Sequence, residues 1–306
     1  MKVPTTGERV KRRLATLNEV EFDSHDRATT IGGSEIAAVV GLHPYKTTYQ
    51  LWLEKRRLFP PEDLSEKDAV HFGQQIEPII RERWLANNKI DPAGMVCRRS
   101  TLIHPLIPWM SYSPDSYHAD GTFGLEIKFV GYRMLRGWGI EMTDQIPELY
   151  LLQVAWGAVV TRIPVWYIVA LVGTELRTYK YVHRPELGRF LLRRARRFMR
   201  VHVGMNIPPA PKGNDVGKLK ALLPSESDKI RQATPHERAL LQRYSEIYPE
   251  YKRLEAEVED LRAEIESHIG PDLGITDGHH TATWKPGKAP GKRSWGWRNE
   301  KEQGNE

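Results

Sequence analysis

The sequence has almost no cysteine, since Cys97 is the only one among 306 residues. A single thiol cannot form a disulfide within the chain, which is typical of proteins in a reducing compartment. Cysteine-ligated zinc sites and iron–sulfur clusters are excluded as well, because both require several thiolates. The eleven histidines, His279 and His280 included, show no metal-ligand spacing with Cys97, and we assign no zinc site.

Long hydrophobic runs are also missing. Residues 1–8 lack the apolar core of a signal peptide, and no apolar run is long enough to span a bilayer. We therefore expect a cytoplasmic protein with no membrane partner, located in the host cytoplasm if a phage encodes it.

Charge of one sign is present only in small excess, with a net charge of +6 and a pI near 9.2. This excess favours a polyanionic partner but would also suit many ordinary proteins. The arginine-rich segment 186–203 could follow a DNA backbone or form a solvated helix face. With 40% hydrophobic residues and nine tryptophans, the chain can bury a core.

The hydrophobic pattern predicts an α/β (α+β) domain over residues 1–210, in which helices flank a mixed central sheet. Helical spacing predicts helices near 34–41, 47–58, 69–88, 144–161 and 186–203. Ser34 is expected to cap the first of them, and Gly41 to end it. Shorter apolar segments predict strands at 94–103, 109–118, 122–130, 164–171 and 175–182.

A proline-rich stretch at 207–211 predicts a domain boundary, which leaves residues 211–306 as a C-terminal extension. Apolar residues in alternating steps of three and four predict a helix at about 236–268. This helix could be amphipathic with one buried face, or form a coiled coil with another copy of the chain. A small hairpin is expected at 275–284, and the basic tail from residue 285 is expected to be flexible.

The most informative segment is a predicted hairpin at 111–128. The Asp-Gly pair at 120–121 favours a two-residue turn, which places Asp115 directly opposite Glu126. Two opposed carboxylates repel each other unless a cation lies between them. Lys128 follows Glu126 by two residues and therefore points to the same face of the strand.

These residues would suit metal-dependent hydrolysis of a phosphodiester. Mg²⁺, for which Mn²⁺ can substitute, would bind Asp115, Glu126 and the backbone carbonyl of Ile127. Lys128 could orient a metal-bound water or assist its deprotonation. The alternative is a surface hairpin with solvated side chains, but apolar neighbours such as Leu125 and Ile127 favour a central strand.

The same segment resembles the PD-(D/E)XK nuclease signature, with Ser-Pro-Asp at 113–115 and Leu-Glu-Ile-Lys at 125–128. More specifically, the chain is similar to the YqaJ-type viral recombinases, a group related to phage lambda exonuclease. Four blocks carry this resemblance in the same order, over roughly residues 25–205. The first runs from Arg27 to Glu35, and the others are residues 72–78, the hairpin, and residues 150–154. The resemblance implies a restriction-endonuclease-like core.

The resemblance also implies roles for individual residues. Asp115 and Glu126 match the metal ligands of the family, and Lys128 matches its catalytic lysine. Glu77 matches a helix glutamate that acts on the metal through water. Gln153 matches a helix glutamine with a role in the catalytic site.

Three further residues, Arg27, Ser34 and Ser113, fall where members of the family hold the 5′-phosphate of a DNA end. An arginine fork and hydroxyl groups suit a phosphate. One position departs from the family pattern, since many members carry a second glutamine where this chain has Ala155. The role of that second glutamine is therefore in doubt here.

The implied activity is processive 5′→3′ digestion of one strand of linear double-stranded DNA, which leaves 3′ overhangs for recombination. The resemblance further implies a homo-oligomer, a trimeric ring around DNA, and a single-strand annealing protein as partner. Two alternatives stay open. One is an endonuclease on the same fold, and the other is a non-catalytic protein that binds DNA ends as a recombination accessory.

Overall fold

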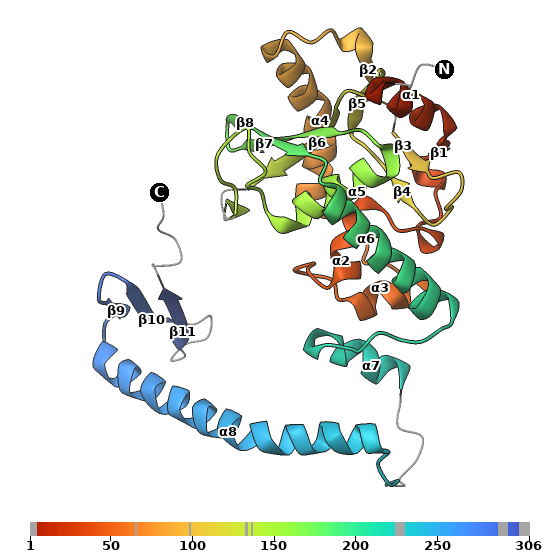
Figure 1. Ribbon diagram of the computed structural model, residues 1–306. Helices are drawn as coiled ribbons and strands as arrows, with labels where there is room; N and C mark the ends of the chain where they lie inside the picture. The colour runs from red at the N-terminus through yellow and green to blue at the C-terminus, as the bar shows by residue number, and fades with distance from the viewer. Residues whose placement is uncertain are drawn as a thin grey trace. The chain divides into compact units, whose positions relative to one another are not determined.

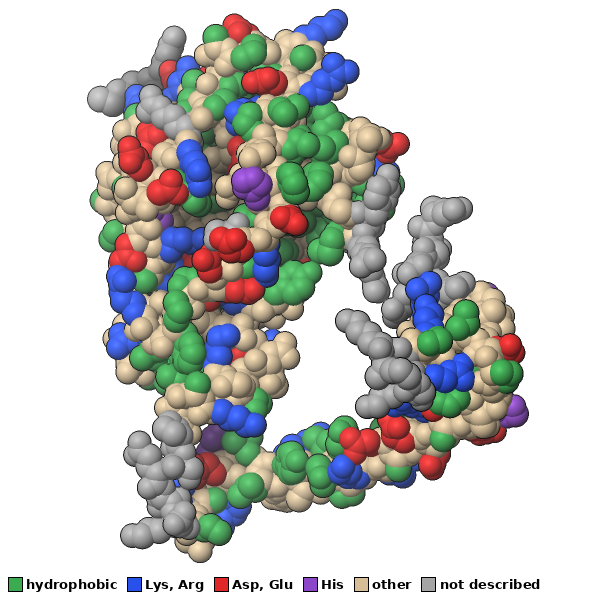
Figure 2. All heavy atoms as spheres, turned by 180° about the vertical axis from the view of Figure 1, so that it is seen from behind, with side chains coloured by type: hydrophobic (Ala, Val, Ile, Leu, Met, Phe, Trp, Pro, Cys, Tyr) green, Lys and Arg blue, Asp and Glu red, His purple; other side chains and the backbone are tan. Residues whose placement is uncertain are grey.

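The computed structural model describes residues 5–64, 66–97, 99–131, 134–135, 137–223, 230–286 and 293–299. The chain forms two compact units, Met1–Pro224 and Ser225–Glu306. Within the described residues, no helix is both long enough and apolar enough to cross a membrane. On the face of the first unit that Figure 2 shows, acidic and basic side chains are interspersed.

A five-stranded mixed sheet is the centre of the first unit (Figure 1). Its strands lie in the order β2 (Met95–Val96), β5 (Ser116–His118), β6 (Gly124–Val130), β7 (Val165–Val172) and β8 (Glu175–Val182). Strands β6 and β7 are parallel, and the other neighbours are antiparallel. Because β6 lies between β5 and β7, most of its side chains are buried.

Helices cover both faces of this sheet. On one face, Ile80 and Trp84 of α4 (Asp68–Asn87) pack with Leu125 and Ile127 of β6. On the other, α5 (Glu148–Thr161) belongs to the larger core that includes Ile168 of β7. Glu126 alternates with Leu125 and Ile127 along β6 and therefore faces away from α4. The predicted fold class, a mixed sheet flanked by helices, is confirmed.

The remaining elements of the first unit surround this sheet. They are α1 (Thr6–Thr16), α2 (Ile36–Val40), α3 (Thr48–Lys55), α6 (Pro185–Arg197), α7 (Val216–Leu222), and a second sheet of β1 (Asn18–Glu21), β3 (Ser100–Ile103) and β4 (Ser111–Tyr112). Helix α6 continues as a π-helix over Phe198–Gly204. Helix α7 belongs to this unit although it follows the proline-rich stretch, because the buried Asp215 accepts a hydrogen bond from Thr47 at 2.7 Å.

Several predicted boundaries are wrong. The expected strand at 94–103 is divided between β2 and β3, and the expected strand at 109–118 is divided between β4 and β5. Pro114 lies at the second break, where a residue without an N–H cannot continue a ladder. Helix α3 ends at Lys55, short of the expected Leu58, because Arg57 has a positive φ of 56° and Leu58 is exposed.

The turn between β5 and β6 also differs from the predicted two-residue turn. Gly121 donates to the His118 carbonyl at 2.8 Å, and Ala119 donates to the Gly94 carbonyl instead of pairing with Thr122. Only Gly121 of the Asp-Gly pair has a positive φ, 76°. The wider loop nevertheless keeps the predicted register, with Ser116 opposite Leu125 and Tyr117 opposite Gly124.

The second unit contains the predicted long helix, α8 (Pro235–Ile269), and a three-stranded sheet of β9 (Gly274–Thr276), β10 (His280–Pro286) and β11 (Arg293–Asn299). The predicted hairpin corresponds to β9 and β10. Strand β11 contradicts the expected flexible tail over its seven residues. Its Trp295 lies opposite Trp284, and Arg293 lies over the Trp284 ring at 4.1 Å.

Candidate active site

Strand β6 brings two of the predicted site residues together, and the chain before β5 supplies the third. Asp115 Oδ2 accepts a hydrogen bond from the Ile127 backbone at 2.6 Å. Glu126 Oε1 accepts one from Lys128 Nζ, also at 2.6 Å. All three side chains line one cavity of about 220 Å³. The predicted register therefore places Asp115 beside Glu126, as the sequence indicated.

Two further side chains hold Glu126 in place. The Tyr112 hydroxyl donates to Glu126 Oε2 at 2.7 Å, and Gln153 Nε2 from α5 donates to Oε1. Gln153 was expected at the site, whereas sequence reasoning missed Tyr112. No pattern in the sequence marks this tyrosine, because its partner is set by how β4 lies against β6. Both oxygens of a carboxylate that is 1% exposed are thus hydrogen-bonded.

Two glycines make room for the Tyr112 ring. A Cβ added at Gly33 would lie 2.6 Å from Tyr112 Cε2, and one added at Gly157 would lie 2.6 Å from Tyr112 Cζ. Real Cβ atoms do not approach other carbons so closely. The second glycine of the 31–35 block is therefore required by the packing of the tyrosine that contacts Glu126.

The electrostatics of the site favour a bound cation. Burial raises the pKa of Asp115 well above its usual value, and repulsion from Glu126 raises it further. Burial also lowers the pKa of Lys128, but attraction to Glu126 and Asp115 outweighs this effect and gives a net increase. Burial and the Glu126 carboxylate raise the pKa of Tyr112, so that its hydroxyl keeps the hydrogen that it donates. An additional positive charge between the two carboxylates would relieve their repulsion.

The donor set fits a magnesium-type ion. Asp115 and Glu126 supply carboxylate oxygens, and Mg²⁺ is usually held by one or two carboxylates, waters and substrate phosphates. No group of three or more histidine, cysteine or acidic side chains is gathered to hold a metal among the residues that the structure describes. The residues present therefore suit a hard ion that keeps open positions, and they do not suit a closed structural zinc site.

Glu77 lies at the edge of this arrangement. It forms an ion pair with Arg81 at 3.3 Å and is not one of the residues that line the cavity. Burial raises the pKa of Glu77, Arg81 lowers it, and repulsion from Glu126 raises it again. Glu77 is therefore close enough to Glu126 for their charges to interact. Pro78 lies inside helix α4, as the sequence indicated.

The three residues expected at a DNA 5′-phosphate line the same cavity as the carboxylates. Arg27 Nη2 donates to Ser34 Oγ at 3.1 Å, and Ser113 shares a 2.8 Å hydrogen bond with Thr101. Ser34 does not cap a helix, which corrects the prediction. The chain forms a 3₁₀ turn over Gly33–Glu35, and the Glu35 carboxylate accepts the Gly32 N–H at 3.0 Å.

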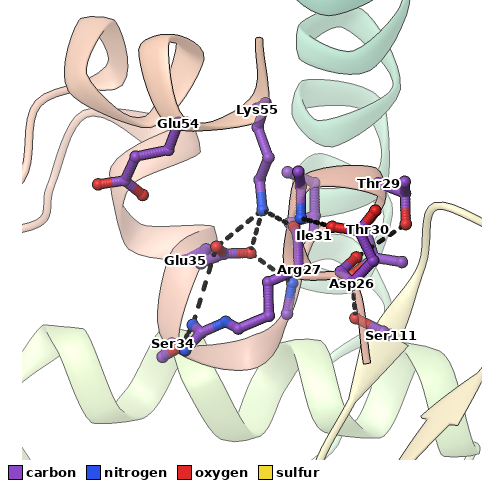
Figure 3. Close-up of polar contacts among 12 residues, drawn as sticks. Asp26, Arg27, Thr29, Thr30, Ile31, Ser34, Glu35, Glu54, Lys55 and Ser111 are labelled. Carbon is purple, nitrogen blue, oxygen red and sulfur yellow. Dashed lines mark hydrogen bonds and ion pairs between the residues drawn. The ribbon is translucent and has the colours of Figure 1, made fainter. Parts of the chain in front are cut away.

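Sequence reasoning also missed Glu35 and Lys55, which contact each other next to Arg27 and Ser34 (Figure 3). Ala155, where many relatives have a second glutamine, is fully buried in the core and does not line the cavity. A glutamine side chain at this position of α5 would have to enter the core.

The chain is similar to several known proteins. The chain is 25% identical over 283 residues to "Uncharacterized protein YqaJ" of Bacillus subtilis (strain 168), which covers 89% of this chain and 86% of that protein. It is also similar to an alkaline exonuclease (LHK-Exo) from Laribacter hongkongensis, with a TM-score of 0.47 and 16% identity over 66% of this chain and 97% of that one. LHK-Exo in complex with dAMP gives a TM-score of 0.46, with 16% identity over 64% of this chain and 94% of that one.

The family model of the YqaJ-like viral recombinase domain matches residues 24–164. This range contains Asp115, Glu126, Lys128, Gln153 and the three residues expected at a phosphate. The resemblance drawn from the sequence is thereby confirmed, since residues 24–164 match this family model.

Proposed function

We propose that the protein is a metal-dependent exonuclease that digests one strand of linear double-stranded DNA from its 5′ end and leaves a 3′ overhang. One observation carries this proposal. Asp115, Glu126 and Lys128 line the same small cavity as Arg27 and Ser34. Groups suited to cleave a phosphodiester thus share a cavity with groups suited to bind a terminal phosphate.

Asp115 and Glu126 would hold Mg²⁺, or Mn²⁺ in its place, with the Ile127 carbonyl as a further ligand. When bound, such an ion supplies an acidified water and stabilises the charge that develops on the phosphate. Tyr112 and Gln153 keep the Glu126 carboxylate in one orientation through their hydrogen bonds. Glu77, which does not line the cavity, would act on the metal through a water molecule.

Lys128 supplies the fixed positive charge of the site. Its ammonium lies 2.6 Å from Glu126 Oε1, and the side chain is largely buried. A cation that is already oriented stabilises a developing negative charge more effectively than one that must first be ordered. We assign to Lys128 the stabilisation of the scissile phosphate and the orientation of the attacking water.

The phosphate-binding groups favour a DNA end over an internal site. A terminal phosphate carries more negative charge than a phosphodiester and can accept several charge-assisted hydrogen bonds. Arg27, Ser34 and Ser113 offer a guanidinium and two hydroxyls for this purpose.

The proposal extends to the setting of the reaction. A cytoplasmic enzyme of phage-type recombination would pass its 3′ overhang to a single-strand annealing protein, and a trimeric ring of this chain would keep it on the DNA. We assign the chemistry to residues 1–210. Whether another copy of the chain binds α8 is a separate question from catalysis.

A single experiment separates this proposal from its alternatives. Linear duplex DNA with 5′-phosphates and the same DNA as a covalently closed circle are incubated with the protein and Mg²⁺, with Asp115→Asn as control. We expect loss of the linear DNA only, and none with the variant. Cleavage of the circle would indicate an endonuclease. Binding of ends without any digestion would indicate an accessory protein.

A further inference from the structure

A buried ion pair lies directly behind the proposed phosphate-binding residues, and the proposed chemistry does not use it. Lys55, at the last turn of α3, directs its ammonium at both oxygens of Glu35, at 2.7 and 2.8 Å. The side chains are 1% and 6% exposed, respectively. Figure 3 shows this pair between the backbone of Arg27 and the turn that carries Ser34.

The pair is joined to both of those segments by hydrogen bonds. Lys55 Nζ donates to the Arg27 carbonyl at 2.6 Å, and Glu35 Oε2 accepts the Gly32 N–H at 3.0 Å. The Lys55 ammonium has three N–H donors. The two Glu35 oxygens and the Arg27 carbonyl are its three acceptors. The ion pair therefore fixes the backbone of Arg27 relative to the turn at 32–35.

The side chain of Arg27 forms a longer ion pair with Glu35 than Lys55 does. Its Nη2 donates to Ser34 Oγ at 3.1 Å but lies 3.8 Å from Glu35 Oε1, beyond hydrogen-bond distance. No other hydrogen bond of this guanidinium is formed with the part of the chain that the structure describes. The Arg27 side chain is 55% exposed and lines the cavity that contains the carboxylates. It thus keeps donors for a ligand.

Charge balance explains why Lys55 is required for this arrangement. A buried carboxylate is strongly destabilising without a partner cation. Because Lys55 already neutralises Glu35 at close range, Arg27 does not have to. If the lysine were neutral, Arg27 would be the nearest remaining cation, and the carboxylate would draw its guanidinium inward and away from the cavity.

From this geometry, and resting on the proposed function, we propose that the Lys55–Glu35 pair positions the end-phosphate site. Lys55 neutralises Glu35 so that Arg27 and Ser34 stay available to the 5′-phosphate of a DNA strand. Neither residue contacts the phosphate. Lys55 acts through Glu35 on Arg27, because it keeps the carboxylate from drawing the guanidinium out of the cavity.

A purely structural ion pair would behave differently when its two members are changed singly. Removing either partner of a structural pair leaves a buried charge and destabilises the fold in both cases. The positioning role makes the two changes unequal at the phosphate site. Lys55→Met leaves a carboxylate that attracts Arg27. Glu35→Gln removes this attraction, and its amide oxygen can still accept the Gly32 N–H that holds the turn.

The test measures binding of a short fluorescent duplex with either a 5′-phosphate or a 5′-hydroxyl, in EDTA, where metal-dependent cleavage does not occur. The quantity compared is the ratio of the two dissociation constants. We expect Lys55→Met to reduce the preference of the wild type for the phosphate by about tenfold, the effect of losing one charge-assisted hydrogen bond. Glu35→Gln should keep the preference, and adding it to Lys55→Met should restore most of it.

Lys46→Met is the matched control, because Lys46 forms an ion pair with Glu54 at 2.7 Å but has no contact with Arg27. It should keep the preference. Thermal unfolding of each variant shows that the proteins compared are folded.

Three results would overturn the positioning role. They are an equal loss of preference in Lys55→Met and Glu35→Gln, an unchanged ratio in Lys55→Met, and no preference in the wild type. None of these results bears on whether the enzyme digests linear DNA. That activity is decided separately, by the comparison of linear and circular substrates.

Discussion

Tyr112 donates its hydroxyl hydrogen to Glu126 at 2.7 Å, from a side chain that is 1% exposed. The carboxylate therefore receives a hydrogen bond on the oxygen that Lys128 and Gln153 do not contact. Since the burial of Tyr112 and the Glu126 charge both raise the tyrosine pKa, the hydroxyl stays protonated over the whole physiological range. The tyrosine acts as a fixed donor to a proposed metal ligand.

Replacing Tyr112 with phenylalanine should therefore weaken metal binding more than it weakens the fold. We expect the Mg²⁺ concentration for half-maximal digestion to rise, and the free energy of unfolding to fall by about 1–2 kcal/mol. Titration of the initial rate with Mg²⁺ and thermal unfolding measure the two effects. Tyr181→Phe is the matched control, because Tyr181 of β8 is equally buried and its hydroxyl accepts a hydrogen bond from the Arg184 backbone N–H. A rise of the same size in the control would contradict the assignment.

Lys128→Ala should reduce the rate of DNA digestion on the order of 10²–10³-fold, which is typical of removing one preorganised charge from an active site. Binding of DNA ends should be retained, because Arg27 and Ser34 are unchanged. Lys180→Ala on β8 of the same sheet serves as control and should digest DNA at the wild-type rate. If Lys128→Ala digested DNA as fast as the wild type, the lysine would have no catalytic role.

Asp115 predicts an unusual dependence of stability on pH in the absence of metal. Its pKa is raised in the folded protein, first by burial and then by Glu126, so its stabilising contribution is complete only below its unfolded pKa of about 3.9. That contribution is lost as the pH rises towards the folded pKa. In EDTA at neutral pH, Asp115→Asn should therefore unfold at a higher temperature than the wild type.

The difference between Asp115→Asn and the wild type should shrink as the pH falls towards about 4. Mg²⁺ should reduce it at neutral pH by stabilising the wild type alone. If the wild type were more stable than the variant in EDTA at neutral pH, the predicted repulsion between Asp115 and Glu126 would be wrong.

Gly33→Ala should destabilise the first unit and lower activity together. Its new Cβ would lie 2.6 Å from the Tyr112 ring, and overpacking of this kind costs about 1–3 kcal/mol. Movement of the ring would also lengthen its hydrogen bond to Glu126. Gly217→Ala in α7 is the control, since nothing lies within 4 Å of its added Cβ and alanine favours a helix. Thermal unfolding and initial rates of digestion test both variants.

The parts of the site that the sequence predicts are those governed by local geometry. Alternation along β6 and the loop register place Asp115 beside Glu126, even though the turn itself has a different form from the predicted one. Tyr112 and Lys55 could not be found in this way. Their contacts with Glu126 and Glu35 depend on how separate segments pack, and spacing along the chain carries no information about that.

The incorrect boundaries have a similar physical origin. Apolar residues at both ends of 94–103 predict a single strand, but the chain leaves one sheet and enters the other between Val96 and Ser100. In the second unit, the glycines, prolines and lysines after residue 285 obscured the alternation of Trp295 and Trp297 in β11. Composition favoured a flexible tail there, but β11 pairs with β10, and Trp295 lies opposite Trp284.

Strand β6 is paired on both sides, and Leu125 and Ile127 anchor it in the core beneath α4. Its backbone amides should therefore exchange with solvent deuterium only when the whole first unit unfolds. Glu126 and Lys128 belong to the same strand, so partial opening at the periphery would leave them in place. On heating, activity and tertiary structure should consequently disappear in one transition.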